Sequence, residues 1–244
     1  MIGDILMINR ELFKEEFDKK NKYEILNDYA CYANERSYLN IDKYYNISFK
    51  EYNPLIILFT FEDDKDKLYN FLNKYIDKKN KIKIKKINRK SNIDIDKLKN
   101  NLFKTLLSGN FEHAISFAKE IYLRDKFLFF KILYTFSFIG ELKHFKFLFV
   151  YSLERILEVN YYENIFFAVL YYLVKKRDNI HDKNLKDIDI SGISEFNRKL
   201  LNTILNIIDK YGIKNEKLLS KISYELSTDF KVDEELKYTL EKYL

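Results

Sequence analysis

The chain of 244 residues contains one cysteine, one proline and five glycines, and it has no tryptophan. A single cysteine, Cys31, cannot form an internal disulfide, which argues for a reduced protein rather than a disulfide-stabilised one. So little proline and glycine leaves few turn signals, as expected for an α-rich chain and not for a β-sandwich. Hydrophobic residues make up 47% of the chain and aromatic residues 17%. This is enough to fill a sizeable core.

The sequence also lacks a long apolar run. Its most apolar stretch, residues 127–140, contains Lys131 and is shorter than the roughly 20 residues that a membrane-spanning helix needs. The first residues, MIGDILMINRELFKEEF, lack the basic flank and the apolar centre of a secretory signal. We therefore expect no membrane span and an intracellular, cytoplasmic protein.

The net charge of +6 comes mostly from lysine, while arginine is scarce. Lysine, asparagine, isoleucine, tyrosine and phenylalanine are over-used together, and these are the residues of A- and T-rich codons. An AT-rich genome would supply much of this basic excess without selection for an anionic partner. The net charge therefore does not by itself indicate nucleic-acid binding.

The first 90 residues show a change of period that predicts strands. Residues 10–39 have a helical pattern, but YYNISFKEY (residues 44–52) alternates, and LIILFTF (residues 55–61) is a continuous apolar run of strand length. A helix follows over residues 62–79, with Asp63 or Asp64 placed to cap it. Lysine and isoleucine then alternate over residues 81–85, as in a strand with one buried face. We predict a small α/β unit at residues 1–90 with about three strands.

Beyond residue 90 every segment has helical spacing, which predicts an all-helical domain of seven or eight helices over residues 91–244. The predicted fold class is mainly α: the small α/β unit is followed by this helical-hairpin, α-solenoid-like domain. Three segments are apolar almost all round and should form its centre. The expected helices cover residues 94–107, 111–123, 127–138, 143–158, 162–176, 195–211, 215–227 and 233–243.

Within residues 95–158, the segment GNFEHAISFA (residues 109–118) resembles the turn and second helix of a tetratricopeptide repeat. Gly140-Glu141-Leu142 opens a second such turn, 31 residues after Gly109, against a usual period of 34. The resemblance implies helical hairpins stacked side by side. Known repeats of this kind bind peptides or other proteins, and no ligand-contacting residue can be transferred to this chain.

The acids Glu62, Asp63, Asp64 and Asp66 follow the apolar run directly. Carboxylates at the end of a buried strand can hold a divalent cation for phosphoryl transfer. Acids in the first turn of a helix also cap its free N–H groups and need no further role, and we favour this reading. No catalytic residue is therefore predicted.

Metal and cysteine chemistry are not predicted either. His113, His144 and His181 are widely separated, and none has a second histidine or a cysteine three or four residues away. Cys31 lies in an Ala-Cys-Tyr-Ala context without an evident base, so we expect it to be a packed core residue. We expect neither a metal nor a cofactor.

The most functional-looking feature is the lysine strip KKNKIKIKKINRK (residues 78–90). At alternate positions of a strand, its side chains would be spaced about 6 to 7 Å apart, close to the spacing of nucleic-acid phosphates. Lysines on an edge strand also prevent aggregation without any ligand. The candidate nucleic-acid contacts are Lys78, Lys79, Lys81, Lys83, Lys85, Lys86, Arg89 and Lys90. Lys175, Lys176 and Arg177, with Lys183 and Lys186, would add a second basic surface.

The sequence thus predicts a non-catalytic adaptor or subunit of a larger assembly. It would bind a protein partner through its helical surface and contact nucleic acid through the basic strand. A nucleic-acid-binding module in its own right is the alternative. A metal-dependent phosphoryl-transfer enzyme using residues 62–66 is the third reading, and the sequence does not define the oligomeric state.

Overall fold

The computed structural model describes residues 9–33, 39–41, 43–49, 52–76, 91–178, 193–213, 215–228 and 231–244. The chain divides into two compact units. Unit 1 draws its described residues from the stretches 1–85 and 152–171, and unit 2 draws them from 86–151 and 172–244. Helices α8 (Lys146–Val159) and α9 (Glu163–Lys175) each contribute residues to both units.

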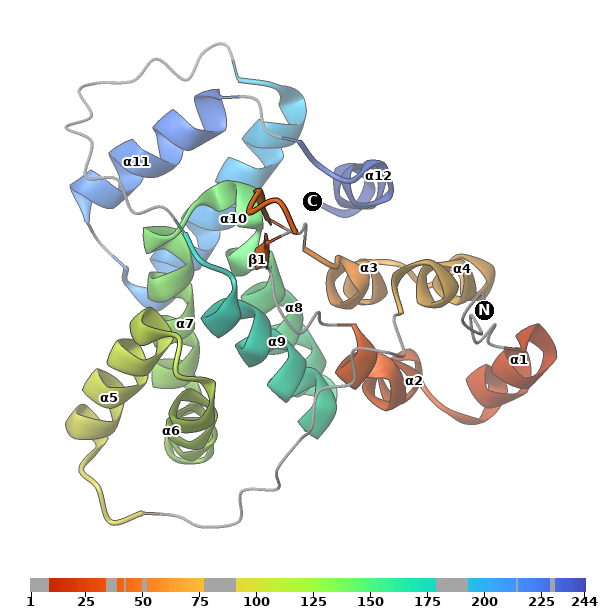
Figure 1. The fold of residues 1–244 in the computed structure, drawn as a ribbon, viewed down its shortest axis with the longest axis horizontal. Coiled ribbons are helices and arrows are strands. Elements are labelled where there is room, and N and C mark those ends of the chain that lie inside the picture. Colours follow the sequence, from red (N-terminus) through yellow and green to blue (C-terminus); the bar gives the residue numbers. More distant parts are fainter. Residues whose placement is uncertain are drawn as a thin grey trace. The chain divides into compact units, whose positions relative to one another are not determined.

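Unit 1 is built mainly from short helices (Figure 1). Phe13 of α1 contacts the ring of Tyr69 in α4, while α2 packs on α3. Asn27 of α2 also bonds to Asn164 in the first turn of α9: its side-chain oxygen accepts the Asn164 N–H at 2.9 Å. The elements, in chain order, are α1 (Arg10–Lys19), α2 (Lys22–Tyr29), the 3-10 helix η1 (Ala30–Tyr32), strands β1 (Leu39–Ile41) and β2 (Ile47–Phe49), α3 (Leu55–Phe61) and α4 (Lys65–Tyr75).

The predicted strand LIILFTF is wrong, because Leu55–Phe61 forms helix α3, and every one of its side chains is buried. A run that is apolar at nearly every position suits a helix buried on all sides as well as a buried strand, so periodicity could not separate the two. Pro54 precedes α3 and fits there, since the first turn does not use the missing N–H. Asn53 closes the start by accepting the N–H of Leu55 at 3.0 Å.

The alternating segment at residues 44–52 contributes only β2, which pairs antiparallel with β1 in a hairpin of three-residue strands. Leu39 lies opposite Phe49, and Ile41 lies opposite Ile47. The expected strand at residues 81–85 falls outside the described residues. The described part of residues 1–90 is therefore helical with one small hairpin, and the predicted N-terminal α/β unit is wrong.

The helical pattern of residues 10–39 is interrupted after Lys20. Asn21 ends the first pattern and starts α2 with a capping box: its side chain accepts the Glu24 N–H, and the Glu24 carboxylate accepts the Asn21 N–H. Helix α2 is followed directly by η1, where Cys31 is buried as expected. Asp64 caps α4 as predicted, accepting the Lys67 N–H at 3.0 Å.

The eight helices predicted beyond residue 90 are all found, each starting and ending close to its expected bounds. Most of them begin at a polar N-cap residue that can be recognised in the sequence, because its side chain accepts a backbone N–H of the first turn. Examples are Asn110, Asp125, Ser194 and Asp233. Besides α8 and α9, the helices are α5 (Ile95–Ser108), α6 (Phe111–Arg124), α7 (Lys126–Ile139), α10 (Glu195–Tyr211), α11 (Glu216–Ser227) and α12 (Glu234–Tyr243), with a 3-10 helix η3 (Leu142–His144) before α8.

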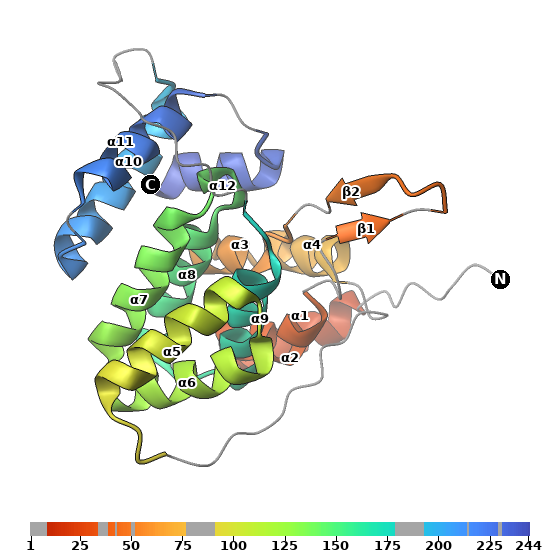
Figure 2. The same cartoon turned by 60° about the vertical axis from the view of Figure 1, so that its left-hand side comes forward.

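In unit 2, successive helices pack on one another. Helix α5 pairs with α6, α6 with α7, and α10 lies against α7 and α11 (Figure 2). The core is rich in aromatic rings: Tyr134 is fully buried between Phe138 and Tyr211, and Phe149 lies 4.3 Å from Tyr172, measured between ring centroids. Burying several rings of this size supplies much of the hydrophobic stabilisation of the unit.

Candidate functional site: a buried polar cluster in unit 2

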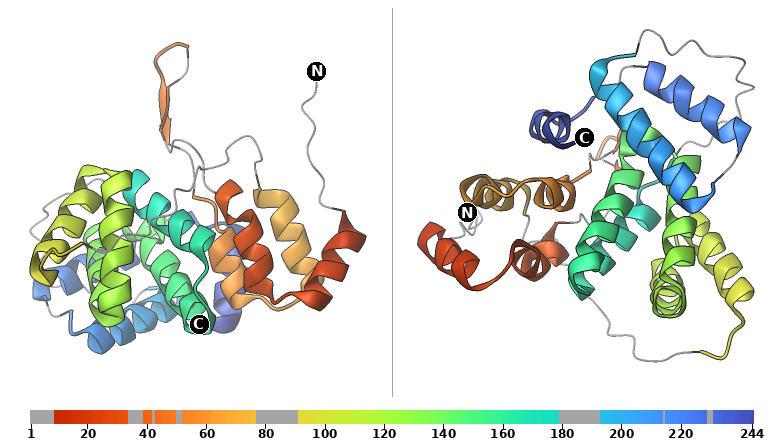
Figure 3. Two further views of the ribbon diagram at one scale, coloured as in Figure 1. Left: turned by 90° about the horizontal axis from the view of Figure 1, so that it is seen from below. Right: turned by 180° about the vertical axis from the view of Figure 1, so that it is seen from behind.

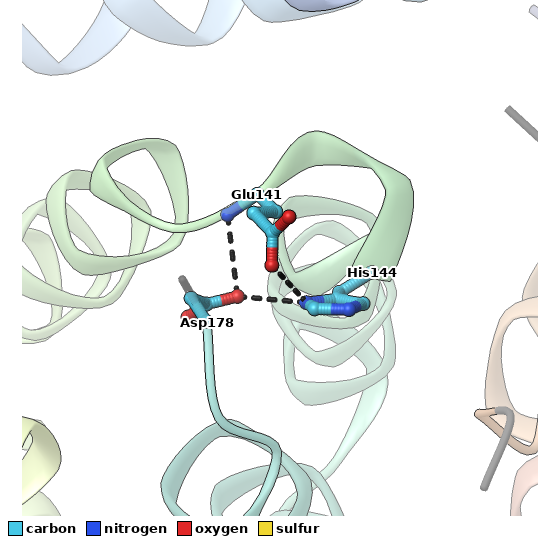
Figure 4. A group of neighbouring side chains, drawn as sticks. All are labelled: Glu141, His144 and Asp178. Atoms are coloured by element: carbon cyan, nitrogen blue, oxygen red, sulfur yellow. Dashed lines mark hydrogen bonds and ion pairs between the residues drawn. The ribbon is translucent and has the colours of Figure 1, made fainter. Parts of the chain in front are cut away.

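The turn from α7 to α8 carries the most concentrated group of buried charges. Helix α7 ends at Gly140, η3 follows, and Phe145 then takes a left-handed backbone conformation with φ of 50° before α8 begins. This conformation is unusual for a non-glycine residue and marks a tightly determined turn. The turn places Glu141 and His144 on the side that faces Asp178, which follows the end of α9 (Figure 4). Lys146, at the start of α8, bonds to the same carboxylate.

Asp178 is the centre of the cluster. Its Oδ1 lies 2.8 Å from Nδ1 of His144 and also accepts the backbone N–H of Glu141 at 3.2 Å. Its Oδ2 accepts a hydrogen bond from Nζ of Lys146. Because an ionised carboxylate only accepts, Nδ1 carries the proton of the bond to His144. Both oxygens of this buried carboxylate are thereby satisfied.

Among the described residues, Lys146 is the most deeply buried charge, with 1% of its side chain exposed. Besides Asp178, its Nζ donates to the backbone oxygen of Lys176 at 2.7 Å and lies 5.0 Å from the ring centroid of Phe136. Burial lowers the pKa of Lys146, although the neighbouring carboxylate opposes that shift. Burial would by itself raise the pKa of Asp178, but the bonds from His144 and Lys146 outweigh it, so that pKa lies below its usual value.

Neighbouring groups fix the backbone of the turn. The hydroxyl of Tyr172 donates to the backbone oxygen of His144 at 2.6 Å. From α11, Glu225 accepts the Leu142 N–H at 2.6 Å, and Lys221 donates to the Gly140 oxygen at 2.6 Å. A Cβ atom at position 140 would stand 2.5 Å from Oδ2 of Asp178, so the close approach of the carboxylate requires glycine there.

The residues just before Asp178 bind a second turn of unit 2. Arg177 donates to the carbonyl oxygens of Leu107 and Ser108 at 3.0 and 3.2 Å, and Lys175 donates to that of Gly109 at 3.3 Å. These are the orphan carbonyls at the end of α5, which basic groups commonly satisfy. The segment 175–178 therefore joins both glycine turns singled out in the sequence, and we call it the α9 clasp. Lys176 is buried, whereas Lys175 and Arg177 make these bonds and stay exposed. Lys183 and Lys186 lie outside the described residues, so the expected second basic surface stays a prediction.

The acids at residues 62–66 do not converge. Glu62, with 3% of its side chain exposed, accepts the N–H groups of Asp63 and Asp64 and pairs with Lys67 at 2.9 Å. Asp63 pairs with Lys22 at 2.7 Å, and Asp66 pairs with Arg10 at 2.8 Å. Burial would raise the pKa of Glu62, but the bonds from Lys67 and the two N–H groups outweigh it and lower that pKa.

The other predicted residues stay apart as well. His113 lies in the exposed first turn of α6, stacked on Phe117, and does not join the cluster around His144. His181 and the whole lysine strip from Lys78 to Lys90 lie outside the described residues. The nucleic-acid contacts assigned to that strip stay a prediction.

A second feature stands on the surface of unit 1. The β1–β2 hairpin extends away from helices α1–α4 (Figure 3) and carries Ile41, Tyr44 and Tyr45, which are 56%, 71% and 87% exposed. Tyr45 has φ of 66°, a left-handed conformation that costs a non-glycine residue on the order of 1 kcal/mol. Lys43 lies 4.9 Å from the ring centroid of Tyr44.

Sequence reasoning missed both features. Glu141 and His144, three residues apart, could have been recognised in the sequence as two neighbouring metal-ligating side chains. Asp178 joins them only through the tertiary fold. A lysine inside the apolar segment that follows His144 was a second clue, because buried lysines are rare unless they are paired. For the hairpin, the tyrosines gave no signal, since the chain has 20 of them.

No family model, no curated protein and no solved structure matches this chain. In the part of the chain that the structure describes, no helix combines the length and the apolar character needed to cross a membrane.

Proposed function

We propose that this chain is a non-catalytic adaptor or subunit that binds a partner protein, and that the β1–β2 hairpin makes the contact. The observation that carries the proposal is the exposure of Ile41, Tyr44 and Tyr45 together on one projecting hairpin. Tyrosine is enriched at protein interfaces because it combines a large apolar area with a hydrogen-bonding end and loses little entropy on binding.

The backbone of Tyr45 supports the same reading. A left-handed tyrosine on a hairpin costs free energy, and its ring gains little within the protein because 87% of the residue is exposed. Such strain is often kept where a side chain must be presented to a ligand. Ile41, a branched apolar residue on the same hairpin, favours an apolar protein surface over a nucleic acid as the partner.

The polar cluster of unit 2 supports a binding role over a catalytic one. Asp178 and Lys146 are bound to each other and to backbone groups, and the acids at 62–66 have separate partners. In both places the charged side chains are held by partners within the protein, which favours a structural role for them. The resemblance of residues 95–158 to repeats that bind proteins agrees with this reading.

Photo-crosslinking tests the proposal. The photoreactive residue p-benzoylphenylalanine is placed at Tyr45 and, as a matched control, at Tyr238, which is 61% exposed on α12. In a lysate of the source organism we expect a discrete protein adduct from position 45 only. The adduct should disappear when Ile41 and Tyr44 are changed to serine.

Two outcomes would contradict the proposal. Equal labelling from positions 45 and 238 would mean that the hairpin is not a preferred contact. An adduct that nuclease removes would favour the alternative, in which Lys43 and the tyrosines bind nucleic acid by charge and base stacking.

A further inference from the structure

We propose that Glu141, His144 and Asp178 form a binding site for a divalent transition-metal ion, with Zn²⁺ as the best-fitting ion. Among the described residues, these three bring one ligand atom each to within 4.8 Å of one another. The site would stabilise the turn between α7 and α8. This inference does not depend on the hairpin contact proposed above.

The ligand atoms are close to the spacing that a tetrahedral ion requires. Zn²⁺ binds nitrogen and oxygen ligands at about 2.0 to 2.1 Å, which places two ligand atoms of a tetrahedron about 3.3 Å apart. Nδ1 of His144 is 2.8 Å from Oδ1 of Asp178 and 3.9 Å from Oε2 of Glu141. The third pair, Glu141 with Asp178, lies within 4.8 Å, so the Glu141 carboxylate must move toward the other two ligands. The proton on Nδ1 of His144 shifts to Nε2, which leaves Nδ1 free to bind the ion.

Surrounding groups hold the ligands in place, as they do at known metal sites. Oδ1 of Asp178 is oriented by the Glu141 N–H, while Oδ2 is held by Lys146, and Lys143 pairs with the other oxygen of Glu141 at 2.7 Å. Tyr172 fixes the backbone of His144. Lys146 can therefore stay on Oδ2 while Oδ1 binds the ion.

The composition of the site selects the class of ion. One imidazole and two carboxylates suit zinc and its neighbours, whereas Ca²⁺ and Mg²⁺ prefer six or more oxygen ligands. The side chains of Glu141 and His144 keep 17% and 11% exposure, so an ion and a completing water molecule can reach them from solvent.

The test uses the full chain, freed of any affinity tag and stripped of metal. Zn²⁺ titration should show one ion bound per chain and raise the melting temperature by several degrees, since the ion binds the folded state. Co²⁺ in the same site should give the visible absorption of a tetrahedral complex. Mg²⁺ at the same concentration should change neither.

Three variants locate the site. Glu141→Gln removes a ligand carboxylate that is 17% exposed and keeps a side chain of the same size, so the fold should persist while Zn²⁺ affinity falls at least tenfold. His144→Gln should abolish the Co²⁺ spectrum. His113→Gln, a change of the same kind at an exposed histidine, should leave affinity and spectrum unchanged. The proposal is overturned if Zn²⁺ does not bind, or if Glu141→Gln binds it as tightly as the unchanged chain.

Discussion

The acids at residues 62–66 and the cluster around Asp178 are opposite arrangements of similar side chains. The first group is contiguous in the sequence and diverges in space, because Glu62, Asp63 and Asp66 each turn to a different partner. The second group is separated by 34 residues and converges on one carboxylate. Adjacent residues at a helix start point in different directions, whereas a turn that meets a helix end can focus groups from both.

The largest expected difference between the two groups is in stability. Asp178→Ala would leave the buried ammonium of Lys146 without its carboxylate and the Glu141 N–H without an acceptor. We expect a loss of about 3 to 5 kcal/mol in the free energy of unfolding. Chemical denaturation followed by circular dichroism measures it. Asp63→Ala, which removes an acid that is 81% exposed, should cost no more than about 0.5 kcal/mol.

A second substitution identifies the cause of that loss. If the uncompensated ammonium is responsible, adding Lys146→Met to Asp178→Ala should recover part of the lost stability, because an apolar side chain of similar length needs no partner. Equal stability of the single and double variants would show that the ion pair is not the source. Similar losses of unfolding free energy for Asp178→Ala and Asp63→Ala would contradict the proposed difference between the two groups of acids.

The α9 clasp should show a smaller effect. Arg177→Ala removes two hydrogen bonds to the last carbonyl oxygens of α5 and should cost about 1 to 2 kcal/mol. Arg177→Lys should recover only part, because one ammonium does not reproduce the guanidinium fork. Thermal unfolding of both variants measures the effect. If Arg177→Ala leaves the melting temperature unchanged, the bonds of Arg177 to α5 do not stabilise the fold.

Glu62 provides a test by pH. Its pKa is lowered in the folded state below the ordinary value of 4.5, so its ionised form stabilises the fold above that pH, and this contribution is lost as the pH falls through the folded-state pKa. Glu62→Gln should therefore cost about 1 kcal/mol at pH 7. The difference from the unchanged chain should shrink below about pH 4.5. A difference that stays constant from pH 7 to pH 3 would contradict this role.

The smallest effect is expected for the lysine strip. Changing Lys81, Lys83 and Lys85 to glutamate should leave the Tyr45 crosslink to its partner protein unchanged, because the proposed contact is the hairpin. Filter binding to mixed RNA and DNA at low salt measures the alternative. Retention that falls steeply with salt and vanishes in the triple variant would assign the strip to nucleic acid.

Helices beyond residue 90 were predictable because two local signals agreed. Apolar residues recur at helical spacing in α5, α6 and α10, and capping side chains such as Asn110 and Ser194 mark their starts. Helix α3 lacked both signals. Its residues are almost all apolar, without helical spacing, and its N-cap position is Pro54, which has no capping side chain, so the segment matched a buried strand equally well.

The cluster was beyond sequence reasoning for a different reason. Its central residue, Asp178, follows three basic residues that the sequence assigned to a basic surface. Nothing local shows that Arg177 bonds to α5 while Asp178 bonds to His144 of η3. The direction of each side chain is set by how α9 packs. Glu141 and His144 were visible three residues apart, but a site appears only when the third group is known.

Hydrogen exchange at the backbone amides of Glu141 and Leu142 tests the central role of Asp178 most directly. The Glu141 N–H bonds to Asp178, whereas the Leu142 N–H bonds to Glu225. We expect both amides to be protected in the unchanged chain, and Asp178→Ala, which removes the acceptor of the Glu141 N–H, to speed exchange at Glu141 much more than at Leu142. Rapid exchange at Glu141 in the unchanged chain, or equal acceleration at both amides, would contradict the account.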